Sequence, residues 1–154
     1  MKLKIILVLV WTVFMCSCGG EKGSKETLEK QATPAEQPAT STDPMQNKGI
    51  GPISSVTLGE IDATLATEGE AAFKAKCTAC HKISKKFVGP ALQGVTQRRS
   101  PEWIMNMILN PEEMIQKDPI AQQLIIEFNG APMANQNLTE EEARAILEYF
   151  RTKN

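Results

Sequence analysis

The chain of 154 residues, with a formal net charge of −1 and 42% apolar residues, has room for one ordinary domain. The near-zero net charge excludes attraction of the whole chain to nucleic acid or to an anionic membrane. Its eight aromatic residues predict a core with little apolar area of its own.

The N-terminus has the features of a targeting segment. Lys2 and Lys4 precede an apolar run over residues 5–15, which only Thr12 interrupts. A run of eleven residues is too short to cross a bilayer, which needs about twenty, and is typical of a signal peptide. We therefore expect the protein to be exported.

Cys18 follows this run, between the small residues Ser17 and Gly19, in a sequence that resembles a bacterial lipoprotein processing site. We expect residues 1–18 to form a lipoprotein-type signal peptide, with a lipidated Cys18 as the first mature residue. Cys16 is less favoured because a bulky methionine precedes it. An ordinary cleaved signal with incidental cysteines is the alternative.

A polar stretch follows, in which Leu28, Met45 and Ile50 are the only large apolar residues between positions 21 and 51. So little apolar surface cannot offset the chain entropy lost on folding. We expect residues 19–60 to be a flexible disordered tether, with an end-to-end distance of roughly 35 Å. An expendable leader without a mechanical role is an equal alternative. The folded domain is expected over residues 61–154.

Capping patterns predict several helices in that domain. T-x-x-E sequences at Thr67 and Thr139 each open one, and Ser100 with the following proline opens another. Further helices are expected over residues 111–117 and from residue 118 to about 130. Because no segment alternates with period two, we expect an all-α domain.

The central motif is Cys77-Thr78-Ala79-Cys80-His81, the C-x-x-C-H signature of covalent c-type haem. Cys77 and Cys80 share one side of a helical turn, so each thiol can add to a vinyl group, and His81 offers the proximal imidazole. Redox dithiols and half of a zinc site also use C-x-x-C. The chain has no second cysteine pair outside the leader and no βαβ pattern, so one haem c is expected.

The second axial ligand is expected to be a methionine. His81 is the only histidine, which excludes bis-histidine ligation and a distal histidine within the chain. Met133 is favoured because it lies in a non-periodic loop. Met105, Met107 and Met114 lie in helical patterns, where methionine is more often core packing.

From about residue 61 to 151 the chain resembles the class I cytochrome c family. The matching residues are Gly69 and Phe73 before the motif, Gly89, Pro90 and Leu92 after it, the loop of Met133, and Tyr149 and Phe150 in the last helix. The loop sequence Ala-Pro-Met-Ala departs from the Met-Pro of many members.

The resemblance implies a small cytochrome c-like helical domain wrapped around one covalently bound haem, with iron held by His81 and Met133. It implies that the carbonyl of Pro90 accepts the Nδ1–H of His81, which orients the ring. It also implies that the last helix crosses the first at Gly69.

Three residues are candidate partners of a haem propionate. For Trp103, plain core packing is the favoured role. For Arg98 and Arg99, the alternative is a solvated turn.

A haem with two protein ligands has no open position for substrate, which favours electron transfer over catalysis. We therefore expect a protein that is not an enzyme: a membrane-anchored monohaem carrier of a respiratory chain, on the periplasmic side of a bacterial membrane. Its partners would be a quinol-oxidising complex and a terminal oxidase or periplasmic reductase, without nucleic acid. The alternative is a haem enzyme, or a gas- or peroxide-reactive haem protein with a displaceable sixth ligand. A structural haem in an assembly subunit is a weaker third interpretation.

Charge is distributed unevenly along the domain. Residues 71–101 include seven basic residues and no acidic one, whereas the rest of the domain has four basic and twelve acidic residues. We expect these basic residues to steer the haem edge toward an acidic patch on a partner, with solvated surface as the alternative. They are Lys74, Lys76, Lys82, Lys85, Lys86, Arg98 and Arg99.

Overall fold

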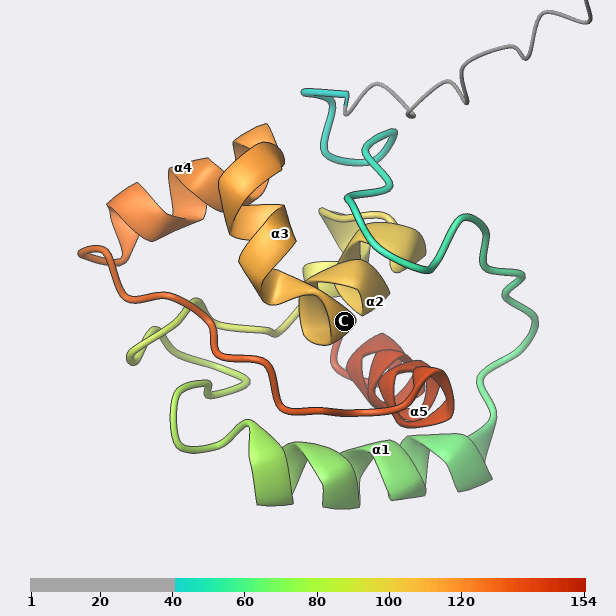
Figure 1. Cartoon of the computed structure of the whole chain (residues 1–154). Coiled ribbons are helices and arrows are strands. Elements are labelled where there is room, and N and C mark those ends of the chain that lie inside the picture. Colours follow the sequence, from blue (N-terminus) through green and yellow to red (C-terminus); the bar gives the residue numbers. More distant parts are fainter. Residues whose placement is uncertain (1–40) are drawn as a thin grey trace, which may run out of the picture. The chain divides into compact units, whose positions relative to one another are not determined.

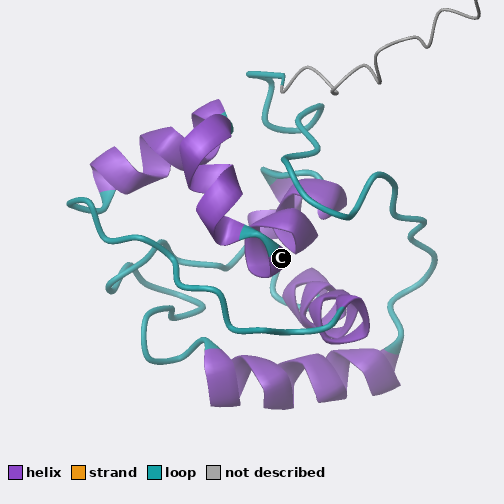
Figure 2. Ribbon diagram, viewed as in Figure 1, coloured by secondary structure: helices purple, strands orange, loops and turns teal. Residues whose placement is uncertain are grey.

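The computed structural model describes residues 41–154, and this part of the chain is all-α, as expected. Within it there is no strand, and Figure 2 shows helices joined by long loops. The elements in chain order are α1 (Ala63–Lys76), the 3₁₀-helix η1 (Val95–Gln97), α2 (Pro101–Leu109), α3 (Pro111–Lys117), α4 (Pro119–Glu127) and α5 (Glu140–Arg151).

Helices α1 and α5 cross at Gly69, as the resemblance implies (Figure 1). A Cβ atom at Gly69 would collide with the carbonyl group of Ala145 on α5, so only glycine allows this approach. Aromatic rings fill the space beside the crossing. The ring centroid of Phe73 lies 5.5 Å from that of Tyr149 and 5.7 Å from that of Phe150.

The start of α1 differs from the prediction. The helix begins at Ala63, because the side chain of Asp62 accepts hydrogen bonds from the amides of Thr64 and Leu65 at 2.8 and 3.0 Å. Thr67 lies inside the helix, where its hydroxyl donates to the carbonyl of Ala63 at 2.9 Å. The T-x-x-E pattern there is therefore not the cap.

The other predicted helix starts are confirmed. The Ser100 hydroxyl accepts from the Trp103 amide at 3.1 Å, and Pro101 occupies the first turn of α2. Asp118 caps α4, and Thr139 forms a complete capping box at the start of α5. The face of α5 predicted to be buried is buried, at Ala143, Ile146, Leu147 and Phe150. Within residues 41–154, no helix has the length and apolar character needed to cross a bilayer.

The segment before α1 contradicts the expectation of a tether over residues 19–60. Its described part packs along α2 and then runs to the start of α1, as the cyan to green trace in Figure 1 shows. We call residues 43–59 the strap. Ile53 belongs to the buried core, and Ile50 and Val56 pack against that core. Residues 19–40 lie outside the described residues, so the tether there stays a prediction.

Polar side chains of α2 hold the strap. Asn106 accepts from the amide of Ile53 at 3.0 Å, and it donates to the carbonyls of Lys48 and Ile53, both at 2.9 Å. Glu102 accepts from the amide of Val56 at 3.0 Å. The prediction failed because apolar content measures only hydrophobic burial, whereas this segment is fixed largely by hydrogen bonds to its backbone.

Gly69→Ala is expected to destabilise the holoprotein by about 1–3 kcal/mol, because the added methyl group must separate α1 from α5. Urea denaturation monitored by helical circular dichroism measures this change. Gly59→Ala is the matched control, since a Cβ there meets no atom within 4 Å. Equal stabilities of the two variants would contradict the close crossing.

Candidate functional site

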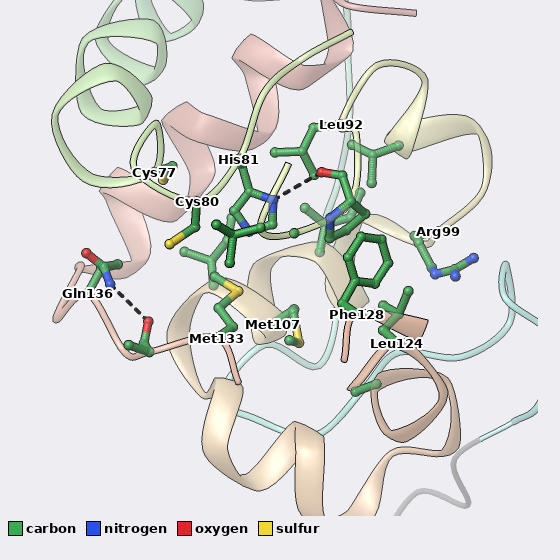
Figure 3. Close-up of a pocket in the computed structure, with 18 of the residues that line it drawn as sticks. Cys77, Cys80, His81, Leu92, Arg99, Met107, Leu124, Phe128, Met133 and Gln136 are labelled. Carbon is green, nitrogen blue, oxygen red and sulfur yellow. Dashed lines mark hydrogen bonds between the residues drawn. The ribbon is translucent and has the colours of Figure 1, made fainter. Parts of the chain in front are cut away.

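One cavity gathers all the predicted site residues that the structure describes. It is lined by Cys77 and Cys80 at the end of α1, by His81 and Pro90 in the following loop, and by Met133 between α4 and α5. In Figure 3 the side chains of His81 and Met133 point into the same space from these two loops, with Cys80 beside them. Cys18 lies outside the described residues.

The remaining lining of the cavity is mostly apolar and comes from every helix after α1 except α3. Helix α2 supplies Ile104, Met107 and Ile108, α4 supplies Leu124 and Ile125, and α5 supplies Ile146 and Phe150. Leu92 and Val95 complete the wall next to His81. Such a lining suits a large flat apolar group rather than a hydrated substrate.

The imidazole of His81 is oriented by one hydrogen bond. Its Nδ1 lies 3.2 Å from the carbonyl oxygen of Pro90, and a carbonyl can only accept, so Nδ1 carries the proton. The lone pair is then on Nε2, where a metal can bind. Burial lowers the pKa of His81, and the bond to Pro90 opposes this change only in part. The ring is thus neutral near pH 7, as a metal ligand must be.

Gly89 provides the space for that ring. A Cβ atom at Gly89 would collide with Cε1 of His81 and would lie 2.8 Å from its Nδ1. Gly89 therefore allows the imidazole ring to pack closely against the backbone, and the carbonyl of Pro90 accepts the hydrogen bond from that ring.

The two thiols border the cavity without forming a disulfide. Burial, and secondarily Cys80, raises the pKa of Cys77 to about 11. A redox dithiol needs the opposite change, a depressed thiol pKa, so this environment does not fit the thioredoxin-like alternative. A half-buried, protonated thiol beside an apolar cavity is compatible with thioether attachment.

The helical methionines differ in position. Met105 lines a separate groove beside the strap, and the sulfur of Met114 accepts from the Ile50 amide at 2.9 Å. Met107 lines the same cavity as Met133, and so does Gln136, which sequence reasoning missed (Figure 3). Gln136 could have been predicted from the sequence, because it lies only three positions after Met133 in the same loop.

Trp103 takes the packing role favoured from the sequence. It is buried and lines the cavity, but its Nε1–H donates to the carboxylate of Asp118 at 3.1 Å rather than toward the cavity. Arg98 and Arg99 both line the cavity. The Arg99 guanidinium carbon lies 5.3 Å from the centroid of the Trp103 ring, which holds it beside the opening.

These residues fit haem c. Two unpaired thiols stand beside a neutral imidazole with a free lone pair, a thioether faces the same space, and the walls are apolar. Cys77 and Cys80 would hold the vinyl-derived carbons, and His81 and Met133 would be the iron ligands.

Comparisons with known proteins agree. The model of the cytochrome c family matches residues 66–153. Cytochrome c-551 of Stutzerimonas stutzeri is 34% identical over 91 residues, which cover 55% of this chain and 76% of that protein.

Solved structures match as well. A cytochrome c from Rhodothermus marinus is 53% identical, with a TM-score of 0.64, over 66% of this chain and 88% of that one. An engineered cytochrome c from the same organism, bound to a carbene intermediate, is 52% identical with a TM-score of 0.61 over the same shares.

The family match spans more than half of the chain, and it includes the Cys77–Cys80 pair that borders the cavity. The chain therefore belongs to the cytochrome c family, as a class I monohaem c-type cytochrome that carries haem c on its cysteine pair.

Proposed function

We propose that the protein is a membrane-anchored electron carrier whose haem iron is held between His81 and Met133, and which passes electrons between respiratory-chain components. Electron transfer is the function of the cytochrome c family. The axial ligands, the anchor and the partners are the steps that we add.

One observation carries the proposal: His81 and Met133 line one apolar cavity from opposite loops. Bound haem supplies a one-electron ferric/ferrous couple. With both axial positions occupied by protein atoms, no coordination site remains for a substrate, so the chemistry is limited to electron transfer.

The surrounding residues support this role by holding the ligands still. Gly89 and Pro90 fix the imidazole of His81, and the walls from α2, α4 and α5 exclude water from the iron. A dry site with a thioether ligand favours the ferrous state and so a high reduction potential.

Met133→Ala is expected to remove the thioether from the iron. The long-wavelength charge-transfer band that marks sulfur–iron ligation in the ferric protein should vanish, the potential should fall, and the ferrous protein should bind carbon monoxide. Absorption spectra and a redox titration of the purified holoprotein measure these changes.

Met107→Ala is the matched control, because Met107 lines the same cavity from α2. It should keep the charge-transfer band. Loss of the band in Met107→Ala, with its retention in Met133→Ala, would move the ligand into α2.

The anchor is proposed at Cys18, on the basis of its small neighbours and the short apolar run before it. The several acyl chains of a lipoprotein bind membranes firmly, whereas one chain binds only marginally. Cys18→Ser should release the haem protein from washed membranes, whereas Cys16→Ser should not. Mass spectrometry that finds an unmodified N-terminus at another residue would exclude the anchor.

The partner surface is proposed around the mouth of the cavity. Phe87 and Val88, in the loop after His81, are 53% and 45% exposed. Lys82 and Lys86 lie over the rings of Phe87 and Phe128, at 5.1 and 4.1 Å from the ring centroids. An apolar patch with a basic rim fits a partner surface that is apolar at its centre and acidic around it.

Lys76→Glu with Lys85→Glu is expected to slow second-order electron transfer to an acidic partner. Both side chains are exposed, Lys76 lines the cavity, and Lys85 lies two positions before Phe87 in the same loop. We choose these two because Lys82 and Lys86 lie over the aromatic rings of Phe87 and Phe128, and a glutamate at either position would remove that contact. Stopped-flow rates at rising ionic strength should converge on those of the wild type, since the Debye length falls from about 10 Å at 0.1 M to about 3 Å at 1 M.

The control is Lys48→Glu with Lys117→Glu, which changes the net charge equally on the strap and on α3. These two side chains make only exposed contacts, with the carbonyl of Ser54 and the carboxylate of Glu113. The spectrum should stay unchanged in both pairs, and the rates are compared after correction for any difference in the measured potential. If both pairs slow electron transfer equally, the effect comes from net charge and not from the position of the lysines. If neither pair changes the rate, electrostatic steering is excluded.

A further inference from the structure

The carboxylate of Asp118 is fully buried at the start of α4. One oxygen, Oδ1, accepts from Nε1 of Trp103 at 3.1 Å and from the amide of Ala121 at 2.8 Å. The other, Oδ2, accepts from Nδ2 of Asn47 at 2.6 Å. All three partners are donors, and a protonated carboxyl group would need an acceptor. The hydrogen bonds therefore fit the ionised form.

This buried charge has no direct cationic partner. Among residues 41–154, the four ion pairs involve other carboxylates, those of Glu70, Glu113 and Glu148. Arg99 lies on the other side of Trp103: its guanidinium carbon is 5.3 Å from the centroid of that ring, and the group donates to the carbonyl of Arg98 at 2.7 Å. The donors of Asp118 are neutral groups, which stabilise a negative charge without cancelling its field.

The same network forms the wall of the haem cavity. Trp103 and Ala121, two of the three donors, line that cavity. The carboxylate thus stands one side chain behind the wall, in a region from which water is excluded. A charge in such a place acts on the cavity with little screening.

We propose that Asp118 sets the reduction potential of this cytochrome, by stabilising the ferric form relative to the ferrous form. Oxidation adds one positive charge to the haem, and the fixed negative charge of Asp118 favours that state. This inference rests on the proposed electron-carrier function. Asp118 does not line the cavity, so it would act on bound haem through its charge and not as a ligand.

The strap contributes to the environment of Asp118. Asn47 reaches Asp118 from a segment 71 positions earlier in the chain, and its own carbonyl accepts from the Ser100 hydroxyl at 2.5 Å. Asn47 thereby supplies one of the three hydrogen bonds that replace water around the buried carboxylate. The strap accordingly contributes to the redox site as well as to stability.

Asp118→Asn tests the proposal, because it removes the charge and keeps an oxygen that can cap α4. A spectroelectrochemical titration of the holoprotein should show a higher midpoint potential than the wild type, so that at a fixed applied potential the ferrous-to-ferric ratio rises several-fold. The sulfur–iron charge-transfer band should persist. If the band is lost, the proposed ligation has failed rather than the role of Asp118.

Asp118→Ser is the second neutral variant. It is needed because the new amide NH₂ of Asp118→Asn can face the NH₂ of Asn47, and two donors cannot form a hydrogen bond. Both should raise the potential, whereas Asp118→Glu, which keeps the charge, should stay close to the wild type. Glu112→Gln, on the exposed face of α3, is the control for net charge and should leave the potential unchanged. An unchanged or lowered potential in a folded neutral variant, with the band intact, would overturn the inference.

Discussion

The packing of the His81 ring against the backbone of Gly89 and Pro90 is the contact on which the site depends. The glycine leaves room for the ring, and the proline carbonyl takes the Nδ1 proton, which leaves Nε2 for iron. Gly89 could not be exchanged freely, because a side chain there would push the ring away. The rest of the fold serves this arrangement by closing apolar walls around the space that the ring faces.

Those walls come from short helices that share one continuous core. The crossing of α1 and α5 at Gly69 brings Phe73 against Tyr149 and Phe150, and this aromatic group forms the part of the core next to the cysteine motif. The rest of the core is mainly aliphatic, and three of its members, Ile104, Ile108 and Ile146, also face the cavity. The cofactor is therefore expected to supply part of the buried apolar area.

Local signals in the sequence predicted much of this structure. Ser100, Asp118 and Thr139 cap helices because each offers a side-chain oxygen to nearby amides, and that chemistry is readable from sequence. The spacing of Cys77, Cys80 and His81 predicted the cofactor for a similar reason.

Interactions between distant segments were not predictable in the same way. Nothing in the composition of residues 43–59 indicated that Asn106 would hold their backbone, or that Asn47 would reach Asp118. The cap of α1 is Asp62 and not the predicted Thr67, because two residues able to cap a helix lie close together in this part of the sequence. Sequence patterns rank such neighbouring caps poorly, because either side chain can accept from amides two or three residues ahead.

The central claim is that a thioether from the loop between α4 and α5 completes the iron coordination and leaves no site for substrate. Nuclear magnetic resonance of the reduced, diamagnetic holoprotein with labelled methionine methyl groups tests it most directly. A methyl group bound through sulfur to haem iron lies over the porphyrin and is shifted far upfield by the ring current. The account predicts one such signal, which disappears in Met133→Leu and persists in Met107→Leu. An upfield signal that belongs to Met107, or the lack of any upfield methyl signal, would contradict it.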